Sequence, residues 1–221
     1  MLELTVLKSD KEVEAIMTMS EKQLETLGFT EHSKRHAAIV SKWSGDILRG
    51  LGAEPARVRL AELAGYLHDI GNCVNRTDHA QSGAILAYKI LVRLGLDYVS
   101  AAEIMTAIGN HDEQYGLPVS DISSALIIAD KADVHKSRVR GAVHDLRLVS
   151  IHERVNLAAE RSYLTVGREE KLITLNIEID TAICSVMDYF EIYFNRMQLS
   201  RRAAEFLGCR FSLVINKTTL L

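Results

Sequence analysis

The sequence predicts a mainly α-helical protein with a small C-terminal α+β appendage. Long stretches repeat their apolar side chains with the period of a helix, and only two prolines occur in the 221 residues. Downstream of residue 141 the period changes to the two-residue alternation of β-strands. With 48% apolar residues, the chain is long enough to bury one core and a smaller unit beside it. We therefore expect two parts, residues 1–140 and residues 141–221.

Capping residues mark the helices of the first part. A capping box that starts at Ser9 is expected to begin one helix, which Gly28 ends. The next helix, residues 33–51, carries His36 on the same stripe as its core-facing apolar side chains. At the N-terminus, the alternation of apolar residues over positions 2–6 predicts a short strand that would join the C-terminal sheet.

The pair His68-Asp69 is the feature most informative about function. It ends an apolar, helix-like run over residues 60–67 and is followed by a glycine turn. An imidazole and a carboxylate at such a helix end can both reach one cation. Asp130 ends another apolar run, residues 125–129, where a carboxylate is costly to bury unless a cation or a donor meets it.

Two further histidines lie at helix ends. His79 opens the helical run 79–86, and His111 follows a Gly-Asn break after the run 101–108. Taken alone, either histidine could be a solvated cap or loop residue. Without both of them, a metal site would hold one ion.

A histidine, a histidine-aspartate pair and a distant aspartate, each at a buried face or end of a helix, resemble the HD-domain metal-dependent phosphohydrolase superfamily. The phrases around the motifs, L-H-D-I-G at residues 67–71 and I-A-D-K at residues 128–131, strengthen the likeness. The resemblance implies an HD-domain helical bundle over roughly residues 10–140. It also implies two metal ions bridged by the catalytic Asp69, with these ligands: His36, His68, Asp69 and Asp130 for one ion, and His79 and His111 supporting the other.

Such a centre predicts hydrolysis by a metal-activated water. Two cations lower the pKa of a bridging water and neutralise charge on phosphoryl oxygens. The expected reaction is cleavage of a phosphoester or phosphoanhydride bond in a nucleotide or another small phosphorylated metabolite. Imidazole and carboxylate ligands suit divalent manganese, iron, zinc, nickel or cobalt, and the three cysteines show no C-x-x-C spacing.

Two basic residues are candidates for binding substrate. Lys131 and Arg138 are seven residues apart, and we place both on one stripe of the helix that carries Asp130. There they would hold the non-reacting phosphate oxygens. The alternative is an ordinary solvated helix face.

Within the superfamily, the chain is most similar to the symmetrical diadenosine tetraphosphate hydrolase branch, a likeness that stops near Lys131. Many two-metal members carry a lysine where this chain has Asn72. That difference favours a first alternative, a catalytically inert HD domain that binds a nucleotide as a regulatory module. A second alternative is a di-iron oxygenase, which the superfamily also contains.

The second part reads as a hairpin, a helix and a strand. Residues 161–166 and 174–179 flank a turn, a long amphipathic helix follows, and residues 211–215 form a last strand. Because a short sheet with open edges tends to be covered or paired, we expect a homo-oligomer such as a homodimer.

Charge and composition bound the partners and the compartment. A net charge of -3 without a basic run argues against a nucleic-acid polymer as the partner and leaves small phosphorylated molecules. No run approaches the ~20 apolar residues that span a bilayer, and residues 1–4 do not have the pattern of a secretory signal, so we expect neither feature. With three cysteines in no framework spacing, we expect a cytoplasmic protein.

Overall fold

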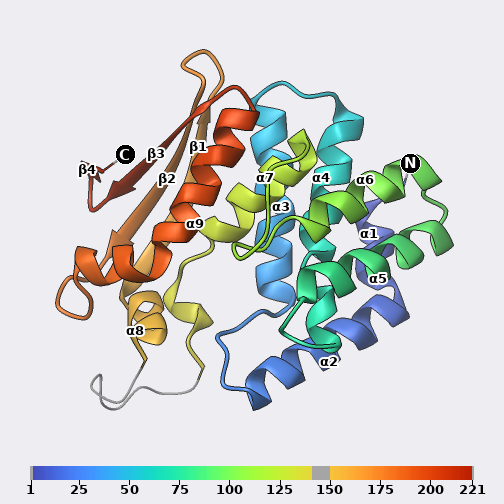
Figure 1. Cartoon of the computed structure of the whole chain (residues 1–221), viewed down its shortest axis with the longest axis horizontal. Helices are drawn as coiled ribbons and strands as arrows, with labels where there is room; N and C mark the ends of the chain where they lie inside the picture. Colours follow the sequence, from blue (N-terminus) through green and yellow to red (C-terminus); the bar gives the residue numbers. More distant parts are fainter. Residues whose placement is uncertain (1, 141–149, 221) are drawn as a thin grey trace.

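The chain folds into a bundle of helices with a small sheet at one side (Figure 1). The computed structural model describes residues 2–140 and 150–220. Up to residue 140 the elements are α1 (Leu4–Ser9), α2 (Lys11–Thr26), α3 (Lys34–Gly50), α4 (Pro55–Leu67), η1 (Ile70–Cys73), α5 (His79–Arg93), α6 (Tyr98–Gly109), α7 (Asp121–Ala132) and η2 (Lys136–Arg138). From residue 150 they are α8 (Ile151–Ala158), β1 (Ala159–Gly167), β2 (Leu172–Ile179), α9 (Val186–Phe206), β3 (Arg210–Ile215) and β4 (Thr218–Thr219). The predicted fold class is confirmed.

The C-terminal sheet has the order β1-β2-β3-β4. β1 and β2 form the predicted antiparallel hairpin, whereas β2 and β3 run parallel. A parallel pair needs a crossover connection, and α9 supplies it. α9 packs against both β3 and α7, so the sheet is joined to the helical bundle through this helix (Figure 1). The division between residues 140 and 141 stays a prediction, because residues 141–149 lie outside the described part.

The prediction of an N-terminal strand is wrong. Residues 4–9 form α1, which packs against α2 and α4. The alternation over so few residues also fits a helix, in which Leu4 and Leu7 lie on one face, and Leu7 is fully buried. The fourth strand is instead β4, which pairs antiparallel with β3.

The predicted capping box at Ser9 is also wrong. Ser9 is the last residue of α1, and its hydroxyl donates to the carbonyl oxygen of Val6 at 3.1 Å. Asp10 caps α2 instead, accepting from the backbone N–H groups of Glu12 and Val13, both at 3.1 Å. Gly28 follows the end of α2 with φ of +77°, as the prediction requires.

α3 and α4 form an antiparallel pair that brings the first candidate ligands together. Gly65 allows this approach, because a Cβ atom at this position would lie 2.7 Å from the Cα atom of Ser41. The hydroxyl of Ser41 donates to the carbonyl oxygen of Glu62 at 2.7 Å and fixes the register of the two helices. The start of α3, with His36, therefore lies beside the end of α4, with His68.

None of the helices in the described part of the chain has the length and apolar character needed to cross a membrane.

Candidate metal centre

Helix ends place four histidines around one point. His36 lies in the first turn of α3, His68 directly follows α4, His79 begins α5, and His111 follows α6 after Asn110. All four side chains are at most 4% exposed. Edge-to-face contacts join neighbouring rings, with centroids 5.0 to 5.1 Å apart for three successive pairs: His36 with His68, His68 with His111, and His111 with His79.

Each of these imidazoles is oriented through its Nδ1 atom. The Nδ1 atom of His36 lies 2.7 Å from Oδ2 of Asp133. The other three lie 2.6 to 3.0 Å from backbone carbonyl oxygens, at Gly65 for His68, Arg76 for His79 and Ile108 for His111. A carbonyl or carboxylate oxygen can only accept, so each Nδ1 carries the proton. The Nε2 atoms are therefore the ones left to bind a proton or a metal cation.

Four donor atoms form the first group. The Nε2 atoms of His36 and His68 are 3.2 Å apart, and they lie 3.4 and 3.6 Å from Oδ1 of Asp130. Oδ2 of Asp69 lies 3.7 Å from the Nε2 atom of His36 and 3.4 Å from that of His68. Ligands about 2.0–2.2 Å from one ion have such spacings.

A second group shares Asp69. Its other oxygen, Oδ1, lies 3.4 Å from Nε2 of His79 and 4.0 Å from Nε2 of His111. The amide of Asn72 donates to the same oxygen at 2.9 Å and to the backbone oxygen of Asp69 at 2.9 Å. The two oxygens of Asp69 thus face different imidazoles, and ligand atoms of His68, Asp69 and His111 all lie within 4.8 Å of one another.

The charges at the centre favour a cation. Oδ2 of Asp69 is buried and has no hydrogen-bond partner among the described residues. Burial opposes the charge of Asp69, but His68 outweighs burial and holds the pKa of the carboxyl well below its usual range. Burial would lower the pKa of His68, yet Asp69 and Asp130 raise it to about 10. Burial also lowers the pKa of His111 to about 3. Without a cation His68 therefore holds a second proton, and a divalent metal ion would take the place of that proton beside the two buried carboxylates.

The prediction that Lys131 and Arg138 share a helical stripe is wrong. α7 ends at Ala132, the chain turns at Asp133, and Arg138 lies in η2. Both side chains are nevertheless buried close to the centre. Lys131 Nζ contacts Oδ2 of Asp130 at 2.5 Å and Oε2 of Glu113 at 2.7 Å. Arg138 Nη1 donates to the carbonyl oxygen of Asp133 at 2.7 Å.

Sequence reasoning missed several residues around the centre. Asp133, 3% exposed, orients His36 and pairs with Arg35 at 3.2 Å. Burial opposes its charge, but the hydrogen bond from His36 lowers the pKa of the carboxyl. Glu113 links Lys131 to Arg196 of α9. No helical or strand period marks these residues, because each acts through a contact between distant segments.

Comparison with known proteins relates this region to one family. The family model described as HD domain matches residues 29–137. Over residues 29–137 the chain is similar to HD domains. The matched region contains every candidate metal ligand and leaves α1, α2 and the C-terminal sheet outside the match.

Two individual proteins are similar to the chain. An uncharacterized protein of Methanocaldococcus jannaschii is 28% identical over 188 residues, which cover 75% of this chain and 70% of that protein. The crystal structure of a predicted HD superfamily hydrolase from an uncultured Thermotogales bacterium is 25% identical, with a TM-score of 0.45. That match covers 61% of this chain and 75% of the other.

Proposed function

We propose that this protein is a metal-dependent phosphohydrolase. Its substrate would be a nucleotide or another small phosphorylated metabolite, cleaved at a phosphoester or phosphoanhydride bond. The observation that carries the proposal is the convergence of four imidazole Nε2 atoms on the two oxygens of Asp69, one of which is buried without a hydrogen-bond partner among the described residues. Protein groups do not satisfy such an arrangement, whereas two divalent cations do.

The two proposed metal ions would share one ligand, Asp69. One ion would be held by His36, His68, Asp69 and Asp130, and the second by Asp69, His79 and His111. When bound, the ions would activate a water molecule for attack and offset the charge of the phosphoryl oxygens. Asp69 would act as the bridging catalytic residue, and Asn72 would hold its carboxylate in place.

Positive side chains beside the centre support a phosphate substrate. Lys131 is 4% exposed and lies between two carboxylates, so its ammonium is fixed close to Asp130. The Arg138 side chain is 5% exposed and lines the same recess. We assign the non-reacting phosphoryl oxygens to these two residues. The symmetrical diadenosine tetraphosphate hydrolase branch stays our nearest expectation for substrate.

The first test is the metal content of the untagged full-length protein, purified without chelators and measured by elemental analysis. We expect about two transition-metal ions per chain. Asp69→Asn should lose metal and the release of phosphate from a panel of nucleotides, while keeping the helical circular dichroism signal. Asp46→Asn is the matched control, because Asp46 lies in α3 and, within residues 2–140 and 150–220, pairs only with Lys42 and Arg49.

Other outcomes separate the alternatives. Hydrolysis that survives complete removal of metal would refute the mechanism. Failure to bind manganese, iron or zinc would indicate a regulatory binding module. Iron-dependent oxygen uptake without phosphate release would indicate an oxygenase.

A further inference from the structure

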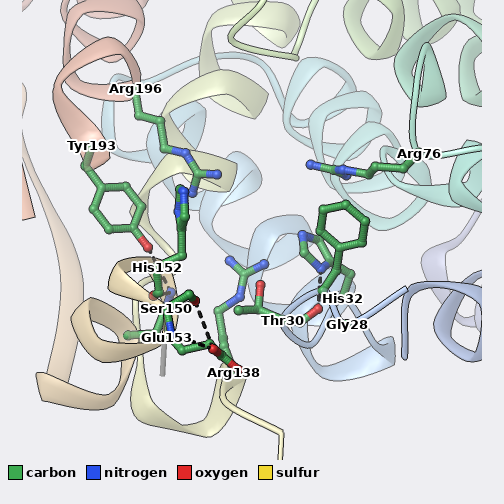
Figure 2. Close-up of a pocket in the computed structure, with 12 residues that line it drawn as sticks. Gly28, Thr30, His32, Arg76, Arg138, Ser150, His152, Glu153, Tyr193 and Arg196 are labelled. Carbon is green, nitrogen blue, oxygen red and sulfur yellow. Dashed lines mark hydrogen bonds between the residues drawn. The ribbon is translucent and has the colours of Figure 1, made fainter. Parts of the chain in front are cut away.

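A second cavity adjoins the candidate metal centre. It has a volume of about 280 Å³, close to the lower end of the ~300–1,000 Å³ of small-molecule pockets. One wall comes from the region similar to HD domains and the other from α8 and α9 (Figure 2). Three arginines line both this cavity and the recess at the metal centre: Arg76, Arg138 and Arg196.

The guanidinium groups of these arginines turn toward one central space from three sides (Figure 2). Arg138 donates from Nε to the carbonyl oxygen of Glu31 at 3.2 Å and from Nη1 to that of Asp133 at 2.7 Å. Its Nη2 atom has no hydrogen-bond partner within residues 2–140 and 150–220, although the side chain is 95% buried. This atom is not among the enclosed polar atoms of the described residues, so it presents a cationic donor to the cavity, where an anionic ligand could accept from it.

Arg196 reaches the cavity from outside the region similar to HD domains. Its Nε atom donates to Oε1 of Glu113 at 3.0 Å, and its guanidinium lies 4.9 Å from the ring centre of Tyr193. In the part of the chain that the structure describes, neither Nη atom has a hydrogen-bond partner. Glu113 also binds Lys131, so one chain of contacts connects Arg196 to Asp130. The C-terminal helix is therefore fixed relative to the metal centre.

Arg76 approaches from the opposite wall. Its Nη1 atom donates to Oδ1 of Asn72 at 3.2 Å and lies 3.8 Å from Oδ1 of Asp69. Its guanidinium lies 5.8 Å from the ring centre of Phe29. Asn72 itself carries no charge, so Arg76 supplies positive charge at this side of the centre. Glu153 is the acidic residue that lines the cavity, and its Oε2 atom accepts a hydrogen bond from the hydroxyl of Ser150 at 2.8 Å.

Arg76, Arg138 and Arg196 together offer more N–H donors than the oxygens of one reacting phosphoryl group can accept from. Metal ions and Lys131 would already offset the charge of that group at the centre. The three guanidinium groups extend positive charge into the adjoining cavity, where their unused N–H groups match the fork geometry of a further phosphate. A monoester of a neutral compound would leave this part of the cavity without an anion.

We propose that α8 and α9 complete the substrate pocket, and that Arg196, together with Arg76, binds a phosphate other than the one that reacts, while Arg138 lies between the two phosphates. The substrate class is then small molecules with at least two phosphates. This inference rests on the proposed phosphohydrolase function. It gives the C-terminal unit a role in substrate selection.

The test measures binding of two probes to the metal-loaded full chain by isothermal titration calorimetry. Methylenediphosphonate carries two phosphonate groups joined through a CH₂ group, which water does not cleave. Methylphosphonate carries a single phosphonate group. Arg196→Gln should weaken binding of methylenediphosphonate about 10- to 100-fold, the loss expected for a charge-assisted hydrogen bond. Binding of methylphosphonate should change less than about threefold, because Arg196 contacts only the second group. Arg196→Lys should restore part of the loss.

Arg202→Gln is the matched control, because Arg202 is an exposed residue of the same helix outside the cavity. Metal content and thermal unfolding are recorded for each variant, so that loss of metal or fold is not mistaken for loss of the anion site. Equal weakening of both probes, or no weakening of either, overturns the inference. If the protein hydrolyses phosphate compounds but Arg196→Gln binds methylenediphosphonate as the wild type does, only this inference is wrong. If Arg196→Gln weakens that binding but the protein hydrolyses no phosphate compound, only the proposed function is wrong.

Discussion

Asp133→Asn tests whether a buried carboxylate behind His36 tunes the metal centre. Oδ2 of Asp133 accepts from Nδ1 of His36 at 2.7 Å and from Arg35 at 3.2 Å, and it lies 3.9 Å from Arg138. A carboxylate behind a ligating imidazole makes the ring a stronger electron donor and fixes its orientation. Asparagine preserves the shape and can still accept from His36, but it removes the negative charge.

The size of the effect follows from these contacts. Loss of such a supporting group typically costs 10- to 100-fold in metal affinity, which is about 1.4–2.7 kcal/mol. Folding stability should fall as well, because Arg35 and Arg138 lose a buried counter-charge. Arg35 keeps its two contacts with Glu31, at 3.0 and 2.7 Å, so we expect about 1–3 kcal/mol rather than the ~3–5 kcal/mol of a fully broken buried pair.

Metal affinity is measured by competition with a chelating dye, and the free energy of unfolding by urea titration. We expect the order of affinity wild type, Asp133→Asn, Asp133→Ala, because alanine also removes the acceptor that orients His36. Asp46→Asn should behave as the wild type. If both variants at Asp133 bind metal within twofold of the wild type, the supporting role of this carboxylate is refuted.

Two further predictions concern stability. In Gly65→Ala the new methyl group would lie 2.7 Å from the Cα atom of Ser41, so we expect the free energy of unfolding to fall by about 1–3 kcal/mol and metal binding to weaken. The control is Gly95→Ala, where φ is +88° and the space around the new methyl group is open. It should lower the free energy of unfolding by about 1–2 kcal/mol and leave metal binding unchanged in the same assays. Partial burial opposes the charge of Asp121, but Arg57 lowers its pKa below 3.8. Its contribution is therefore present above that pH and lost in acid, so the stability difference between wild type and Asp121→Asn should shrink as urea titrations move from pH 6 to pH 3. An unchanged difference would contradict this assignment.

Local signals explain why the positions of these histidines at helix ends were predictable. His68 and Asp69 lie where an apolar run meets a glycine turn, and His79 and His111 lie at the boundaries of α5 and α6. Such boundaries depend on residues within one turn of the chain, so they are visible in the sequence. The N-terminal strand failed for the opposite reason, because positions 2–6 are too few to distinguish a two-residue period from a helical one.

Long-range contacts were not predictable in the same way. The stripe of Lys131 and Arg138 assumed that α7 continues past Ala132, but the chain leaves the helix there and Asp133 turns toward His36. The partner of Glu113, Arg196, lies 83 residues away along the chain. No periodicity encodes such a pair, because it exists only once α9 packs against α7.

The same distinction separates the candidate metal centre from the proposed substrate pocket. His68, His79 and His111 each donate to a carbonyl oxygen only three residues earlier, so the segment that carries the ring also aims it. His36 alone depends on a distant residue, since Asp133 lies 97 positions away. The centre is thus held mainly by local geometry, whereas Arg196 reaches the cavity only through the packing of α9. Changes in the C-terminal unit should therefore alter which phosphate compounds bind before they alter how metal is held.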